Sequence, residues 1–139
     1  MKRLMQVTAG VVLVLCGAVA VLAEDAQPRA YIIAPLNGAQ VTSPVTIKFG
    51  LQNMGVAPAG VERANTGHHH LLIDVAQLPA LDKPVPTDEY HRHFGGGQTE
   101  TRIELTPGIH RLQLLLGDHN HVPHQPPVMS EVITIEVQQ

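Results

Sequence analysis

Apolar and polar residues alternate with a period of two wherever the chain shows a regular pattern. In VTIKFGLQN (45–53), one face collects Val45, Ile47, Phe49 and Leu51. TETRIEL (99–105) and VITIEV (132–137) alternate in the same way, and no segment keeps a helical period over ten residues. Because a period of two is typical of half-buried strands, the pattern predicts an all-β protein.

Turn-forming sequences separate the apolar runs: PLNG, TSP, TPG and GDHN. Many short strands with turns between them predict an immunoglobulin-like antiparallel β-sandwich of about seven strands. TPG, between Leu105 and Ile109, predicts a tight hairpin. Residues 76–96 are rich in Pro, Asp and His and predict a functional surface loop, while 54–67 show no clear pattern. We place strands near residues 29–34, 39–42, 44–53, 68–75, 97–106, 109–117 and 129–138.

The first residues have the layout of a secretory signal peptide. Lys2 and Arg3 precede a mainly apolar stretch over 7–22, and small residues follow at the cleavage position after Ala23. The apolar stretch is short for a helix that spans a bilayer. We therefore expect a cleaved signal over 1–23, a single His-rich domain over 24–139, a periplasmic or secreted location, and no stable membrane anchor after cleavage.

Composition narrows the classes of partner and the means of stabilisation. Without Lys2 and Arg3, seven Lys and Arg face twelve Asp and Glu, a net charge of −5 with neutral histidines, which argues against a nucleic-acid partner. The only cysteine, Cys16, lies in the predicted signal. An exported domain without disulfides depends on apolar packing or on a bound ion.

Histidines carry the candidate chemistry. The chain has nine of them, all between His68 and His124. An H-x-H pair on a strand projects two imidazoles to the same side, and neutral imidazole is a common metal ligand. Copper, or zinc as the second choice, suits an all-imidazole site. The sequence predicts a metal site built from three H-x-H pairs: His68 and His70, His91 and His93, His119 and His121.

Other residues near these pairs have different expected roles. His69 and His110 each share a face with apolar residues, which favours core histidines bonded to backbone carbonyls. His124, Asp74 and Asp118 are candidates for additional ligands or for hydrogen-bond acceptors that orient the ligands, and His69 and His110 are secondary candidates for the same roles. The partners expected from this chemistry are a metal ion and another periplasmic protein.

Two alternatives to metal sequestration or delivery remain open. In the first, the protein is a non-catalytic structural or interaction module, and its histidines bond to backbone and carboxylates. In the second, His68, His70, Asp74 and His110 form a metalloenzyme site that resembles the cupin motifs, with Asp where cupins usually carry Glu. The chain has no nucleophile elbow and no H-E-x-x-H motif, so catalysis is not the favoured interpretation.

Three segments resemble the bacterial family described as domain of unknown function 4399. They are VTSPVTIKFGLQNMGVAPAGVERANTGHHHLLID, HRHFGGGQTET and LLLGDHNHVPHQPPVMSE, which together extend from about Val41 to Glu131. The resemblance implies an exported single β domain in which the three H-x-H pairs form one constellation. It implies no substrate and no particular metal.

Overall fold

The computed structural model describes residues 27–139 of the 139-residue chain. The predicted signal peptide over 1–23 lies outside the described residues. Within 27–139, no helix is long and apolar enough to cross a membrane. The fold is all-β, as the alternation predicts.

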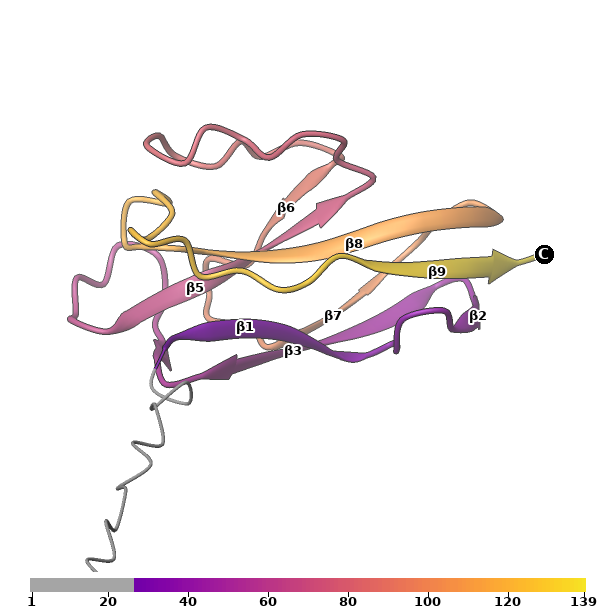
Figure 1. Ribbon diagram of the computed structural model, residues 1–139, viewed down its shortest axis with the longest axis horizontal. Coiled ribbons are helices and arrows are strands. Elements are labelled where there is room, and N and C mark those ends of the chain that lie inside the picture. The colour runs from indigo at the N-terminus through magenta and orange to yellow at the C-terminus, as the bar shows by residue number, and fades with distance from the viewer. Residues whose placement is uncertain (1–26) are drawn as a thin grey trace, which may run out of the picture.

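Two sheets face each other (Figure 1). The smaller sheet has the order β1-β3-β7, and the larger has the order β2-β9-β8-β5-β4, with β6 also paired to β5. Strands β2 and β9 pair in parallel, so the N-terminal segment contributes β1 to one sheet and β2 to the other. The strands are β1 (Arg29–Ala34), β2 (Gln40–Thr42), β3 (Val45–Gln52), β4 (Gly55–Val56), β5 (Thr66–Ile73), β6 (His91–His93), β7 (Glu100–Ile103), β8 (Gly108–Gly117) and β9 (Ile133–Gln138).

Alternating side chains from both sheets build the core between them. Strand β3 contributes Ile47 and Phe49, and β8 contributes leucines at 112, 114 and 116, all fully or almost fully buried. Ile135 of β9 completes the contact. These positions are the apolar half of each period-two pattern, so burial of that half explains why the sheets pack face to face.

The all-β sandwich is confirmed, but the predicted TPG hairpin is wrong. Strand β7 pairs with β3 in the smaller sheet, whereas β8 pairs with β5 and β9 in the larger sheet. The TPG segment therefore crosses from one sheet to the other. Pro107 has no N–H to give to a ladder, and Leu105 packs against the core at the crossing, where its N–H bonds to the Ser43 hydroxyl.

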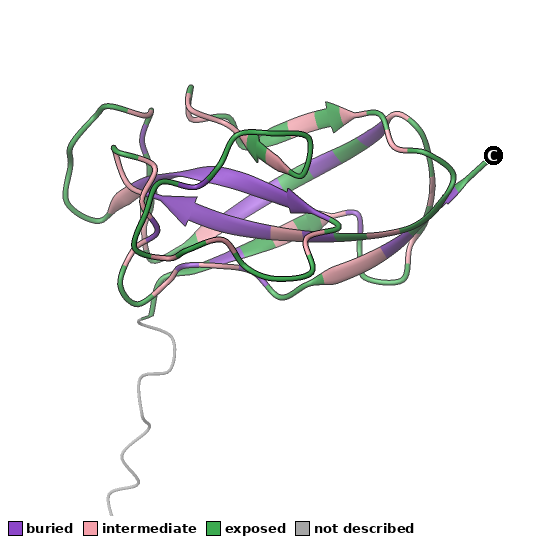
Figure 2. Cartoon of the chain, turned by 90° about the horizontal axis from the view of Figure 1, so that it is seen from above, coloured by how far each residue is buried: buried purple, intermediate pink, exposed green. Residues whose placement is uncertain are grey.

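The segment between β5 and β6 covers the outer face of the larger sheet (Figure 1). Val85 from this segment packs on Leu72 of β5 and Leu115 of β8, which form a second small apolar cluster. Strand β5 is consequently buried on both faces, unlike most strands of the molecule (Figure 2). The covering segment was expected to be a loop, and its end proves to be a short strand, β6, that pairs with β5 at His70–Leu72.

Candidate metal centre

Strand β5 sends its three consecutive histidines to two different environments. His69 points into the core, where its ring centroid lies 5.2 Å from that of Phe49. The expected bond to a backbone carbonyl is not formed, because the apolar core offers neither nitrogen of His69 a partner among residues 27–139. His68 and His70 point to the opposite, outer face, and their ring centroids are 4.8 Å apart. All three side chains are completely buried. The period of two therefore separates one core histidine from two candidate ligands.

Two further imidazoles join His68 and His70 from other segments. His93 is the last residue of β6, where it lies directly opposite His70 in the antiparallel ladder. His121 belongs to the loop after β8, the strand that lies on the other side of β5. These four residues form the four-histidine cluster, and their candidate ligand nitrogens all lie within 4.8 Å of one another.

The cluster is compact enough for a single ion. His68 Nε2 and His121 Nδ1 are 3.1 Å apart. Four nitrogens bound to one zinc ion at roughly 2.0–2.1 Å are about 3.3 Å apart in a tetrahedron. Small movements of the rings would therefore bring all four nitrogens to bonding distance.

The loop that carries His121 is held by Asp118. The Asp118 carboxylate accepts hydrogen bonds from the backbone N–H groups of Asn120 and Val122, at 2.8 and 2.9 Å. Its own backbone carbonyl accepts from the His121 N–H at 2.9 Å. His121 has a positive φ of 68°, a conformation that costs energy in a residue with a side chain and is retained here by these bonds.

The covering segment also fixes this loop. The N–H of Val85 donates to the carbonyl of His121 at 2.9 Å. Because Val85 packs on Leu72 and Leu115 next to the cluster, the apolar cover and the His121 loop hold each other in place.

Two glycines make room for the imidazoles. A Cβ at Gly117 would lie 2.7 Å from Cε1 of His70, and a Cβ at Gly95 would lie 2.3 Å from Cε1 of His93. Neither separation is possible for real atoms, so a side chain at either glycine would displace a ring of the cluster. Sequence reasoning missed both glycines as site residues; the available signal was their position beside histidine pairs, Gly95 after HRHF and Gly117 before DHNH.

Burial keeps His68, His70 and His93 neutral at pH 7. Burial first, and then the neighbouring imidazoles, lower the pKa of His68 to about 4 and that of His70 to about 3. Burial and His121 also lower the pKa of His93. The Asp118 carboxylate has the opposite effect and raises the pKa of His68. Neutral imidazoles have free lone pairs at pH 7, which is the form that binds metals.

Four of the eight ring nitrogens in the cluster are buried without a hydrogen-bond partner among residues 27–139. They are Nδ1 of His68, both nitrogens of His70 and Nε2 of His93. A buried polar atom without a partner costs about 1–3 kcal/mol. Several such atoms directed toward a common point are the arrangement expected where a bound ion completes the site.

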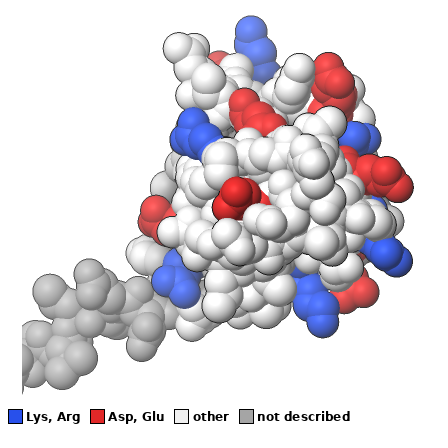
Figure 3. All heavy atoms as spheres, turned by 90° about the vertical axis from the view of Figure 1, so that its right-hand side faces the viewer, with Lys and Arg blue, Asp and Glu red and all other residues white. Residues whose placement is uncertain are grey.

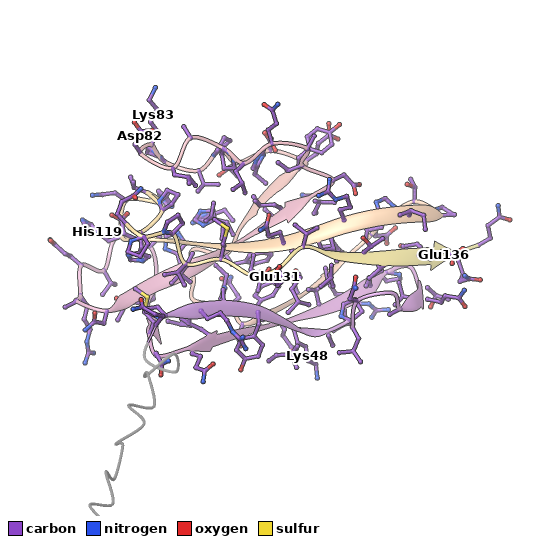
Figure 4. All side chains as sticks on the ribbon, in the orientation of Figure 1. Lys48, Asp82, Lys83, His119, Glu131 and Glu136 are labelled. Atoms are coloured by element: carbon purple, nitrogen blue, oxygen red, sulfur yellow. The ribbon has the colours of Figure 1, made fainter. Side chains whose placement is uncertain are left out.

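The remaining members of the H-x-H pairs lie outside the cluster. His91 bonds through Nδ1 to the Asp88 carboxylate at 2.8 Å. His119 lies in the end loop labelled in Figure 4, and its Nε2 contacts the Asn120 amide at 2.9 Å. Of the six predicted ligands, the structure therefore gathers His68, His70, His93 and His121.

The secondary candidates take other places. His124 is half-buried near Gly67, and burial lowers its pKa while Asp118 opposes that shift. His110 bonds to the Asp74 carboxylate at 2.7 Å and to the Thr106 carbonyl at 2.8 Å. The cupin-like set is consequently not assembled: Asp74 and His110 pair with each other and do not belong to the four-histidine cluster.

Fold and site together define a β-sandwich protein with a candidate four-histidine metal centre on the outer face of one sheet. The chain belongs to the family described as "Domain of unknown function (DUF4399)", whose model matches residues 47–138. That range contains all four histidines of the cluster. No curated protein and no solved structure matches the chain.

Proposed function

We propose that this protein is an exported metal-binding domain that holds one copper ion, with zinc as the alternative ion, for sequestration or delivery in the periplasm or outside the cell. The observation that carries the proposal is the four-histidine cluster, in which three separate segments direct neutral imidazoles to one point. Copper leads because imidazole suits copper in either oxidation state, and imidazole also suits zinc.

The unpartnered nitrogens favour metal binding over a purely structural role. In a hydrogen-bonded scaffold, each buried imidazole would bond to backbone or carboxylate, as His91 and His110 do. Neither nitrogen of His70 has a well-formed hydrogen bond among residues 27–139, and its contact with the Leu115 backbone only opposes the lowering of its pKa. His69 in the core also lacks partners, so the feature that marks the site is the gathering of four imidazoles together with their unpartnered nitrogens. Burying His70 without an ion would lower the stability of the fold, whereas an ion would recover that cost.

The number of ligands favours storage or transfer over catalysis. Four protein ligands fill a tetrahedral coordination sphere, whereas catalytic zinc sites keep one position for water or substrate. His68 and His70 are fully buried, while His93 and His121 are half-buried at the edge of the site. We propose that the ion enters and leaves past His93 and His121, where another exported protein could exchange it.

Metal stoichiometry tests the proposal. The purified, tag-free protein, stripped of metal, is dialysed against copper or zinc, and bound metal is measured by mass spectrometry. We expect one ion per chain, and its loss in His121→Ala. The matched control is His119→Ala, which removes a half-buried imidazole outside the cluster from the same loop and should keep the ion. Absence of bound copper and zinc in the unsubstituted protein would contradict the proposal.

A further inference from the structure

The arrangement of the four rings carries information about the ion beyond its presence. The six separations between ring centroids are 4.6, 4.8, 5.0, 5.0, 5.2 and 6.1 Å. Four rings in a square would give two diagonals about 1.4 times longer than the sides, whereas a tetrahedron gives six equal values. The pattern of separations therefore decides between the two geometries.

Only one separation is long. His70 and His121 are 6.1 Å apart, which would make them one diagonal of a square. The other diagonal would then join His68 and His93, but these rings are only 5.0 Å apart, no farther than true neighbours. The rings therefore surround the central point as a distorted tetrahedron.

Ions differ in their preference for this geometry. Cu²⁺ and Ni²⁺ favour square-planar or tetragonal sites. Zn²⁺ has a filled d shell without a geometric preference and is usually tetrahedral in proteins, and Cu⁺ has the same filled shell. The geometry thus favours Cu⁺ over Cu²⁺ when copper is the ion.

The charge of the site also favours Cu⁺ over Cu²⁺. All four ligands are neutral, and the cluster contains no carboxylate. Asp118 lies outside the cluster and is the acid that raises the pKa of His68 against the effect of burial. One carboxylate balances a monovalent ion and leaves a divalent ion with excess charge. The cost of burying an ion rises with the square of its charge, so a buried site of this kind penalises the divalent form.

We propose that the four-histidine cluster is a cuprous site, which binds Cu⁺ in preference to Cu²⁺ and to Zn²⁺. This inference rests on the proposed function and specifies its ion. Binding is a simple association in which four imidazole lone pairs replace the ligands that Cu⁺ had in solution. Asp118 contributes charge and holds the His121 loop without entering the coordination sphere.

Competition titrations test this preference. Cu⁺ affinity is measured without oxygen, in excess ascorbate, against a chromophoric Cu⁺ chelator. Cu²⁺ and Zn²⁺ affinities are measured against chelators specific for each ion. We expect the dissociation constant for Cu⁺ to be at least about a hundredfold below that for Cu²⁺. That ratio corresponds to a copper reduction potential about 120 mV above that of the aqueous couple, at 59 mV per tenfold change.

The substitution Asp118→Asn isolates the charge. Asparagine keeps a carbonyl oxygen that can accept the Asn120 and Val122 hydrogen bonds, so the loop should remain in place. The Coulomb energy between the carboxylate and the ion is proportional to the ion's charge. If the substitution lowers the affinity for Cu⁺ by about tenfold, it should therefore lower the affinity for Cu²⁺ by about a hundredfold. The preference for Cu⁺ should therefore increase. Asp82→Asn, at the tip of the covering segment in Figure 4, is the control and should change neither affinity.

The possible results separate this inference from the proposed function. Tighter binding of Cu²⁺ or Zn²⁺ than of Cu⁺ would overturn the cuprous assignment and leave a metal-binding protein. Failure to bind any of the three ions would overturn both. If Asp118→Asn lowers the affinities for Cu⁺ and Cu²⁺ by the same factor, the charge of Asp118 does not contribute to the preference for Cu⁺.

Discussion

The four-histidine cluster and the His110–Asp74 pair show two ways in which the same side chain is buried in one sheet. His110, at the start of β8, has both ring nitrogens bonded, one to a carboxylate and one to a backbone carbonyl. His70 faces the opposite end of β8, near Gly117, and among the described residues neither of its nitrogens has a well-formed hydrogen bond; its contact with the Leu115 backbone raises its pKa only against the stronger effect of burial. The first is a completed hydrogen-bonded unit, and the second is a set of lone pairs that an ion could complete.

Missing hydrogen bonds alone do not mark a ligand, because His69 is also buried without partners in the apolar core. What distinguishes His70 is that three other imidazoles lie close to it. Burial lowers the pKa of His70, whereas at His110 the bonds to Asp74 and Thr106 outweigh the opposing effect of burial and raise the pKa. The molecular surface gives no competing indication at the end shown in Figure 3, where Lys, Arg, Asp and Glu are interspersed and form no patch of one sign. The gathered, unsatisfied imidazoles are the feature that calls for a ligand.

The largest expected effect comes from removing one imidazole of the cluster. His70→Ala should weaken metal binding by at least about a hundredfold, whereas His110→Ala should leave it within about twofold. Metal at a hundred times its dissociation constant adds about 2.7 kcal/mol to the free energy of unfolding, so the unsubstituted protein should melt at a higher temperature with metal.

The two variants are compared by thermal unfolding with and without copper and zinc. The metal-dependent rise should disappear in His70→Ala and persist in His110→Ala. His93→Ala, at the edge of the cluster, provides a second test if His70→Ala does not fold. A full rise in both cluster variants would contradict the assignment of the ligands.

A glycine substitution should act on metal affinity more than on folding. A Cβ at Gly95 would meet the far end of the His93 ring, so Gly95→Ala should turn this ring out of the cluster and weaken metal binding by about tenfold or more. Gly96→Ala is the matched control, because its Cβ would meet only the flexible side chain of Gln98. Competition titrations on both variants, together with urea unfolding, measure the two effects. Equal affinities for the two variants would argue against the steric role of Gly95.

The metal-free protein should lose stability in acid because of its buried histidines. The folded-state pKa values of His68, His69 and His70 are lowered from 6.5 to about 4, 4 and 3, so the unfolded chain binds more protons below pH 6.5. The free energy of unfolding should fall as pH drops from 6.5 toward 4, by up to about 1.4 kcal/mol per pH unit for each such histidine.

His110 should oppose this loss. Its raised pKa gives stability that is fully present in acid and disappears as pH rises through the folded-state value. Urea unfolding between pH 7.5 and 5 should therefore show a steeper acid loss in His110→Gln than in the unsubstituted protein. A stability that does not change over this range would contradict the neutral, buried state of the cluster.

The smallest effects are expected at the histidines outside the cluster. His91 forms a partly exposed pair with Asp88, and such pairs contribute about 0–1 kcal/mol. His91→Ala and His119→Ala should each change the free energy of unfolding by less than about 1 kcal/mol and metal affinity by less than about twofold. Calorimetric titration with metal checks both. A large loss of affinity in either variant would show that the site includes both histidines of an H-x-H pair outside β5.

The sequence predicts seven of the nine strands because burial on a sheet imposes a period of two, whereas β4 and β6 are too short to show that period. It separates His69 from His68 and His70 for the same reason. It does not show which member of the second and third H-x-H pairs joins the cluster, because these pairs lie at or beyond strand ends, where the period of two no longer fixes direction. His91 turns to Asp88, and His121 reaches the cluster through a left-handed backbone conformation that local sequence does not reveal.

The sequence also could not predict which strands meet. Ladder contacts bring His93 next to His70, from a position 23 residues later in the chain, and the order of strands is a property of the whole sandwich. The prediction of a TPG hairpin was wrong for the same reason, because a turn motif does not reveal whether the next strand stays in the same sheet. The glycines became recognisable as site residues only when their distances to the rings were known.

X-ray absorption spectroscopy at the metal edge tests the central claim most directly, because it counts the ligands of the bound ion. The metal-loaded protein should show about four nitrogen ligands near 2.0 Å with the multiple scattering typical of imidazole, and His93→Ala should show about one imidazole fewer. A spectrum with oxygen ligands and fewer than three imidazoles, or one that His93→Ala leaves unchanged, would contradict a site in which these four histidines share one ion.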